Sequence, residues 1–211
     1  METKALSVQE KARLERVNAL RAQLEAQGYS CRELTRSLKG AGVLSVVYAL
    51  PFALILSGIF FLKNPEAIGK ILSAGFTEVL LFFVVILLLM VVHELVHGLT
   101  WGLCAKKKFK TIEFGILKST MTPYCYCGEA LPKSAYLAGS FMPCLVLGLL
   151  PSVAAILTGS VFLMLIGLCM TLAAGGDLMV MTDLLRYKPK ATQMICMDHP
   201  VECGLLIFER I

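Results

Sequence analysis

Charged residues are scarce in this sequence. Only 17% of its 211 residues are Asp, Glu, Lys or Arg, whereas 57% are hydrophobic and the mean hydropathy is +0.74. A soluble domain of this size needs a larger polar fraction to cover its surface, so the composition argues against a soluble protein and favours a membrane protein. The net charge of +5 does not indicate nucleic-acid binding, because the basic residues adjoin apolar runs and form no separate basic module.

Two further absences narrow the possibilities. No apolar core lies within the first thirty residues, so we expect no secretory signal peptide there. The eight cysteines contain no C-x-x-C pair, and the lone C-x-C of Cys125 and Cys127 is weak evidence for a structural zinc site. Most cysteines fall in apolar runs or in segments that we place in the cytoplasm, so the sequence predicts free thiols instead of a disulfide framework.

Residues 1–41 are predicted to be a cytoplasmic amphipathic helical segment. Ser7 and Glu10 have the spacing of a capping box at a helix start, and Gly28 is a suitable helix end. Between them a narrow apolar stripe is flanked by basic residues. We expect this helix to lie on the inner leaflet of a membrane or to pack on the rest of the protein.

Four long apolar runs follow, at residues 42–62, 76–103, 134–158 and 160–185. Each is long enough to cross about 30 Å of hydrocarbon, so we predict an all-α integral membrane protein built on a four-transmembrane-helix bundle. Pro143 and Pro151 predict kinks in the third run, and the very short link to the fourth predicts a tight antiparallel hairpin. The bundle, with its 104–133 loop, is expected to be one domain over residues 42–188, followed by a cytoplasmic tail at residues 189–211.

Basic residues set the orientation of these helices. Eight Lys or Arg precede the first run, six lie in the 104–133 loop and four follow the last run, against two between the first and second runs. The positive-inside rule therefore places both termini and the 104–133 loop in the cytoplasm. His97 and Asp177 each lie nine residues before the first basic residue that follows their helices, which puts both about 13 Å from the cytoplasmic end.

The second run contains the sequence HELVH, residues 93–97. On a helix, His93 and His97 project from one face and can bind one zinc ion, while Glu94 is rotated by about 100° and can hold a water beside the metal. Ionisable groups buried in an apolar helix are costly unless they are paired or ligate something, which favours a metal site. Asp177 is the expected third ligand, with Asp183 and Glu129 as alternatives, and one Zn²⁺ ion is predicted although such a site accepts other divalent metals.

At these residues the chain resembles the "Putative zincin peptidase" family of bacterial membrane proteins. The resemblance rests on HELVH and on three further stretches: TPYCYCGEALPKSAYLAGSFMP at 122–143, GGDLMVMTDLLRYKP at 175–189 and DHP at 198–200. It implies His93, His97 and Asp177 as zinc ligands and Glu94 as the catalytic glutamate. The layout is also distantly similar to the site-two intramembrane metalloproteases, whose third-ligand helix carries an Asn–Pro stretch and a leucine–aspartate–glycine motif. Here two glycines precede the aspartate and a leucine follows it.

The 104–133 loop carries a predicted β-hairpin. KTIEFGIL alternates apolar and small or polar residues as a strand does, and STMTPYCYC can return as its partner. Such a hairpin could present an extended peptide at the site, or could simply cover the bundle. The aromatic residues Trp101, Tyr124, Tyr126 and Tyr136 are expected to form an interfacial belt. His199, before Pro200, is expected to be a turn residue in a polar tail.

Three functions remain after this reasoning. The first is a membrane-embedded zinc endopeptidase that acts on membrane-bound or membrane-proximal proteins, in which Glu94 is the general base. The second is a metal-ion transporter whose buried His and Asp side chains line the ion pathway. The third is a membrane adaptor that keeps the metal for folding. The expected location is the bacterial cell membrane, as a multi-pass protein in contact with the lipid bilayer and without nucleic acid as a partner.

Overall fold

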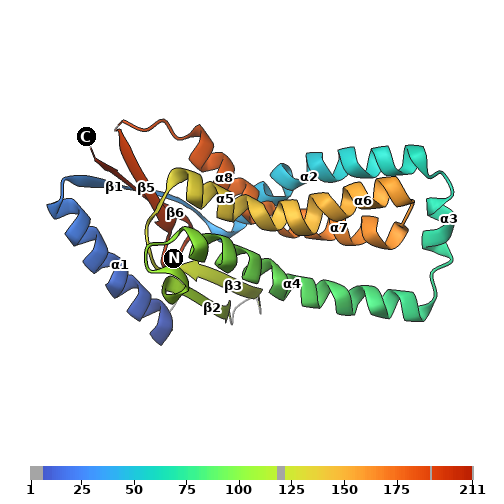
Figure 1. Cartoon of the computed structure of the whole chain (residues 1–211), viewed down its shortest axis with the longest axis horizontal. Helices are drawn as coiled ribbons and strands as arrows, with labels where there is room; N and C mark the ends of the chain where they lie inside the picture. The colour runs from blue at the N-terminus through green and yellow to red at the C-terminus, as the bar shows by residue number, and fades with distance from the viewer. Residues whose placement is uncertain (1–6, 118–121, 191, 211) are drawn as a thin grey trace.

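The chain forms a helical bundle with a smaller β-rich part at one end (Figure 1). The structure, a computed structural model, describes residues 7–117, 122–190 and 192–210. The bundle consists of α2 (Leu38–Lys63), the short α3 (Ala67–Leu72), α4 (Phe76–Cys104), α5 (Lys133–Pro143), the π-helix η2 (Cys144–Leu149), α6 (Leu150–Thr158), α7 (Val161–Ala173) and α8 (Gly175–Arg186).

The apolar runs form helices, as predicted. Within the described residues, three helical segments are long and apolar enough to cross a membrane, or four if the bent pair of α7 and α8 counts as one. The three are residues 39–63, 76–104 and 133–158, which match the first three predicted runs within a few residues. Most of their surface is exposed to the surroundings, as expected of helices whose solvent is itself apolar.

The last two runs are less regular than simple helices. Pro143 is followed by the π-helix, so the predicted disturbance of the third run takes the form of a wide helical turn. Gly159 ends α6 with φ +72°, a conformation that favours glycine, and this produces the predicted tight hairpin to α7. The fourth run bends by 49° between α7 and α8. A Cβ on Gly175 would collide with the backbone of Ser45, so α2 and α8 approach closely at this bend.

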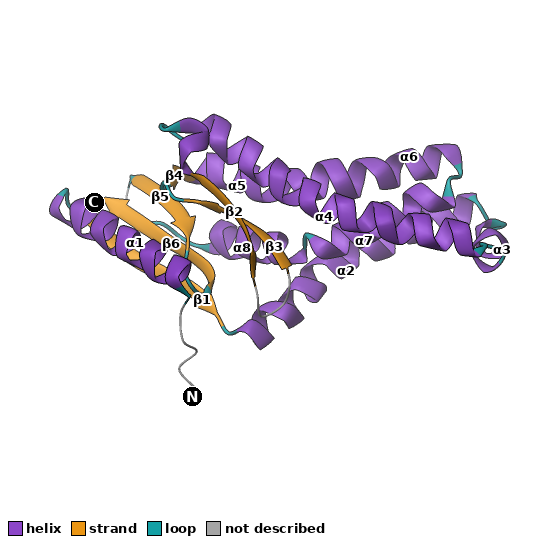
Figure 2. Cartoon of the chain, turned by 90° about the horizontal axis from the view of Figure 1, so that it is seen from below, coloured by secondary structure: helices purple, strands orange, loops and turns teal. Residues whose placement is uncertain are grey.

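The all-α prediction is wrong, because a four-stranded antiparallel sheet lies at one end of the bundle (Figure 2). Its order is β1-β6-β5-β4, and its strands are β1 (Tyr29–Arg36), β4 (Leu131–Pro132), β5 (Gln193–Asp198) and β6 (Cys203–Arg210). Thus the N-terminal segment is a helix followed by a strand, and most of the presumed polar tail is sheet. The register pairs Tyr29 with Arg210 and Arg36 with Cys203, which joins the first strand of the described chain to the last.

The sheet is buried on both faces. Leu205 and Ile207 of β6 pack towards the ends of α4, α5 and α8, whereas Leu206 and Phe208 point to the other face. That second face is covered by α1 (Val8–Ala26), through Val17 and Leu24 (Figure 2). The predicted capping box of Ser7 and Glu10 is present at the start of α1. The N-terminal helix therefore packs on the protein, and its partner is the sheet.

The predicted hairpin in the 104–133 loop is confirmed. The single turn η1 (Lys108–Thr111) follows α4 and leads into β2 (Ile112–Leu117), which pairs antiparallel with β3 (Thr122–Cys127). The hairpin runs back along α4 and packs closely against it. A Cβ on Gly98 of α4 would collide with the ring of Phe114 of β2. His199, in the β5–β6 turn, accepts the backbone N–H groups of Val201 and Glu202 at Nδ1, which confirms it as a turn residue.

Candidate metal centre

The ends of α4 and α8 bring together the three side chains that the sequence predicted as ligands. His93 and His97 lie one turn apart on α4, on the side that faces α5 and α8. Asp177 lies in the first turn of α8, just after the bend that follows Ala174. Among the described residues, these three form the one group of His, Cys, Asp and Glu side chains placed to hold a metal ion.

The three side chains form a triangle of the size that zinc requires. The Asp177 carboxylate lies 3.1 Å from His93 Nε2 and 3.3 Å from His97 Nε2, and the two Nε2 atoms are 3.2 Å apart. Ligands about 2.1 Å from one tetrahedral ion are separated by about 3.4 Å, so the observed edges fit such an ion closely. Asp177 keeps 26% of its side chain exposed, whereas His93 and His97 keep 8% and 4%, so the carboxylate is the most accessible corner of the triangle.

The protonation state of His97 also fits a metal ligand. Its Nδ1 lies 2.9 Å from the carbonyl oxygen of Gly139, which can only accept a hydrogen bond, so Nδ1 carries a proton and Nε2 is the nitrogen that faces the other two candidate ligands. Gly139 can accept this bond because Pro143, four residues later in α5, has no backbone N–H to offer it. The proline that was predicted as a kink thus releases a carbonyl group that orients a candidate ligand.

A stack of aromatic rings holds the His97 ring from one side. The imidazole stacks on Trp101 at 4.9 Å between centroids, and Trp101 stacks on Tyr136 at 5.6 Å. The Tyr136 hydroxyl donates a hydrogen bond to Asp198 of β5, so the stack ends on the sheet. The predicted interfacial belt is therefore wrong for Trp101, Tyr126 and Tyr136, which are 4%, 4% and 2% exposed and pack in the interior. Trp101 lies one helical turn after His97, and this spacing was the signal that sequence reasoning overlooked.

His93 is held differently from His97. Its ring meets that of His97 edge to face at 4.9 Å, and its Nδ1 is buried without a hydrogen-bond partner among the described residues. Asp198 also has one buried oxygen without such a partner. Asp198 belongs to the DHP stretch that carries the family resemblance, but its place beside the bundle had no local signal, because the pairing of β5 brings it there.

The alternative third ligands are engaged elsewhere. Asp183 forms two contacts of 2.7 Å with the guanidinium of Arg36, and Glu129 accepts the backbone N–H groups of Lys106 and Lys107. The cysteines are free, as predicted. Burial raises the pKa of Cys127 to about 11, so this thiol stays protonated at neutral pH and is a poor metal ligand.

Glu94 lies between the three candidate ligands and the hairpin. It is half-buried on α4, it interacts electrostatically with His97, His93 and Asp177, and its carboxylate lies beside the backbone N–H of Cys125 in β3. It is not a member of the candidate ligand group. The predicted catalytic carboxylate is thus close to the triangle and on the side that faces a β-strand.

The comparison with known families agrees with this arrangement. The family described as "Putative zincin peptidase" matches residues 86–192, about half of the chain, which include α4 from Ile86 onward, the hairpin, α5 to α8 and the link to β5. The chain belongs to this family. No curated protein and no solved structure matches this chain. Membership supports a metallopeptidase and zinc as the metal, and the donor set of two imidazoles and a carboxylate fits zinc.

Proposed function

We propose that this zincin-family chain is a membrane-embedded zinc endopeptidase that cuts membrane-bound or membrane-proximal proteins. The observation that carries the proposal is the triangle of His93, His97 and Asp177 with Glu94 beside it, at the end of a long apolar helix. Ionisable groups in an apolar helix cost free energy unless they are paired or ligate an ion. A bound metal ion would offset that cost and would make hydrolysis possible.

The three ligand candidates would hold one zinc ion and leave an open position on the exposed side of Asp177. Zinc, when bound, supplies a Lewis acid that polarises a peptide carbonyl and lowers the pKa of a water molecule. Glu94 would accept a proton from the attacking water and return it to the leaving amine. Gly139 and Trp101 would keep the His97 ring in the orientation and tautomer that ligation needs.

The hairpin would present the substrate. A peptide bond inside a helix is shielded, so a peptidase must bind its substrate in an extended form. β3 lies against α4, with the backbone of Cys125 beside Glu94, and pairing of an extended peptide with the hairpin would bring a scissile bond to the glutamate.

The proposed location is a bacterial cell membrane, with both termini and the hairpin end of the bundle in the cytoplasm. Three features support this topology. Three or four segments are apolar enough to span, the two chain ends meet in one sheet, and the Lys-rich stretch after α4 lies at that same end. The site then lies in the cytoplasmic half of the bilayer.

The test replaces Glu94 with Gln in the full-length chain. We expect zinc content to stay near one ion per chain by elemental analysis, because the candidate ligands remain. Cleavage should fall by at least ~100-fold, because the general base is lost. Cleavage is measured as new protein N-termini in the membranes of cells that express the wild type. These N-termini should be absent from cells that express Glu94→Gln. Glu78→Gln, at the exposed far end of the same helix, is the matched control and should change neither quantity.

His93→Ala should lose both zinc and cleavage, because it removes a ligand. Loss of zinc in Glu94→Gln would make Glu94 a ligand or a structural partner and would overturn the proposed role. Cleavage that persists in Glu94→Gln would place the base elsewhere. A Glu94-independent change in metal flux across vesicles, without new N-termini, would favour transport instead.

A further inference from the structure

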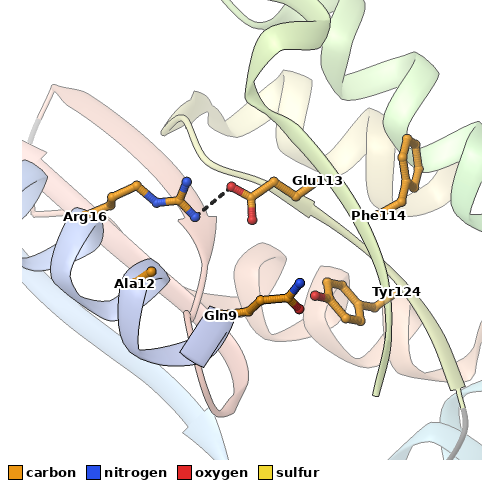
Figure 3. Close-up of a pocket in the computed structure, with 6 residues that line it drawn as sticks. All are labelled: Gln9, Ala12, Arg16, Glu113, Phe114 and Tyr124. Carbon is orange, nitrogen blue, oxygen red and sulfur yellow. Dashed lines mark ion pairs between the residues drawn. The ribbon is translucent and has the colours of Figure 1, made fainter. Parts of the chain in front are cut away.

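A groove runs between α1 and the β2–β3 hairpin, and we call it the α1 groove. At one end, a hollow of about 420 Å³ is lined by Gln9, Ala12, Arg16, Glu113, Phe114 and Tyr124 (Figure 3). A second hollow of about 220 Å³ shares Arg16 and Glu113 with the first and extends to Leu20, Lys107 and Lys110. The two hollows are therefore adjacent and follow the same side of α1.

The α1 groove has the length of a short extended peptide. From Gln9 to Leu20 the helix rises about 16 Å at 1.5 Å per residue, which matches about five residues of extended chain at roughly 3.3 Å each. Its lining includes both aromatic and apolar side chains, such as Tyr126 and Leu20, beside the charged ones. A single phosphate group would fill only a fraction of this length.

The charges along the α1 groove are mostly positive. The carboxylate of Glu113 lies 2.7 Å from Arg16 and 3.6 Å from Arg13, so its charge is already matched by two guanidinium groups. Lys107 and Lys110, at the other end of the groove, are exposed. The groove therefore presents an excess of positive charge to whatever binds there.

The α1 groove leads towards the candidate metal centre. Phe114 lines its first hollow (Figure 3). The ring of Phe114 packs on Gly98, the residue after the candidate ligand His97. A chain that lies in the groove and continues past Phe114 therefore arrives at α4 beside Glu94 and the ligand triangle.

We propose that the α1 groove binds an extended, acidic segment of the protein substrate that lies on the cytoplasmic side of the scissile bond. This inference rests on the proposed peptidase function and adds to it the chemistry of the substrate. Carboxylates at alternate positions of an extended segment lie on one face, where the exposed Lys107 and Lys110 can meet them.

Such a groove would also discriminate between membrane proteins. The cytoplasmic flank of a typical membrane helix is rich in Lys and Arg, and a basic groove repels that flank. Proteins whose cytoplasmic flank is acidic would be attracted instead. The selection acts on the segment next to the membrane helix and does not depend on the residues at the cut site.

The test measures peptide binding, so it does not depend on cleavage. The full-length chain with Glu94→Gln is placed in phosphatidylcholine nanodiscs, and the probe is a fluorescent ten-residue peptide that alternates Asp with Ser. Fluorescence anisotropy should show binding that weakens with added salt and is at least tenfold weaker when Asn replaces Asp. The same peptide with Lys in place of Asp should not bind.

Lys107→Glu with Lys110→Glu should weaken binding of the Asp peptide by at least tenfold and should allow the Lys peptide to bind. Lys188→Glu with Lys190→Glu changes the net charge equally, at exposed positions after α8, and should leave binding within twofold. Equal effects of the two double variants, or none from the first, would overturn the proposal.

Two further outcomes separate this inference from the proposed function. Phosphatidylglycerol vesicles or inorganic phosphate that bind in a Lys107- and Lys110-dependent way, while the Asp peptide does not, would make the groove a phosphate or headgroup site and overturn the proposal. Binding of the Asp peptide by a chain whose wild type yields no new N-termini would support the groove and overturn the peptidase. Glu94-dependent cleavage without preference for acidic flanks would support the peptidase and overturn the proposed role of the groove.

Discussion

The bundle and the sheet of this chain differ in how far their apolar side chains are buried inside the protein. In α4 only 6% of the most apolar 18-residue window is buried inside the protein, whereas five of the eight residues of β6 are buried. The sheet supplies its own interior, between α1 on one face and the helix ends on the other. The bundle leaves its apolar surface to the surroundings, which is expected if those surroundings are lipid.

The candidate metal centre lies where these two regions meet. His93 and His97 belong to the bundle, but the ring stack beside His97 ends on Asp198 of the sheet. The polar groups of the site are thus held by both regions. The apolar bundle thus supplies the candidate ligands, and the sheet supplies part of the support around them.

Two phenylalanines offer the largest test of this contrast. Phe208 in the sheet and Phe60 in the bundle are both fully buried. Phe208→Ala should lower the free energy of unfolding of the sheet by ~3–5 kcal/mol, because burial from water and packing are both lost. Phe60→Ala should cost less, because apolar lipid offers no hydrophobic driving force for burial and the packing loss alone remains.

Hydrogen–deuterium exchange of the full-length chain in nanodiscs measures both losses. Exchange should rise in β1, β5 and β6 with Phe208→Ala and at the α3 end of the bundle with Phe60→Ala. Equal losses of stability in the two variants would show that the bundle, like the sheet, is stabilised by burial from water.

A smaller effect is expected where the stack joins the sheet. Tyr136→Phe removes the hydroxyl that donates to Asp198 and leaves that buried carboxyl group short of a partner, which should cost ~1–3 kcal/mol. Zinc affinity should fall with it, measured by competition with a chelator. Tyr126→Phe is the control, because the Tyr126 hydroxyl is buried without a hydrogen-bond partner among the described residues and its removal should cost nothing. An unchanged zinc affinity in Tyr136→Phe would separate the sheet from the site.

The smallest effect concerns the bundle alone. Pro143→Ala restores a backbone N–H that competes with His97 for the carbonyl of Gly139, so zinc affinity should fall by ~10-fold. Helix content and thermal stability should stay the same or rise, because a proline is removed from a helix interior. Pro151→Ala, in the next helix of the same span, should leave zinc affinity unchanged. If both variants bind zinc like the wild type, the bond to Gly139 does not orient the ligand.

Much of the bundle was predictable because its signals are local. An apolar run of twenty or more residues specifies a spanning helix without reference to the rest of the chain, and HELVH specifies two ligand candidates through helical periodicity alone. Asp177 could be predicted as a partner because helix lengths measured from the basic ends placed it at the depth of His97. The β-hairpin was predictable for the same reason, since its two strands are close in sequence and alternate in polarity.

The sheet was not predictable in this way, because its strands pair across the whole chain. Tyr29 lies opposite Arg210, and the two-residue strand β4 pairs with β5 more than sixty residues later. The short apolar run of residues 205–208 was visible, yet nothing local told a strand from a tail.

The amino-acid sequence by itself determined the apolar helices, the pair of histidines with its glutamate, and the hairpin, since each depends on a pattern within one continuous segment of the chain. Only the tertiary structure decided the four-stranded sheet, the pairing of Asp183 with Arg36, the contact of His97 with the Gly139 carbonyl, and the bond of Tyr136 to Asp198. The physical reason is that a ligand's orientation depends on groups brought to it by packing, and packing joins residues that no local pattern relates.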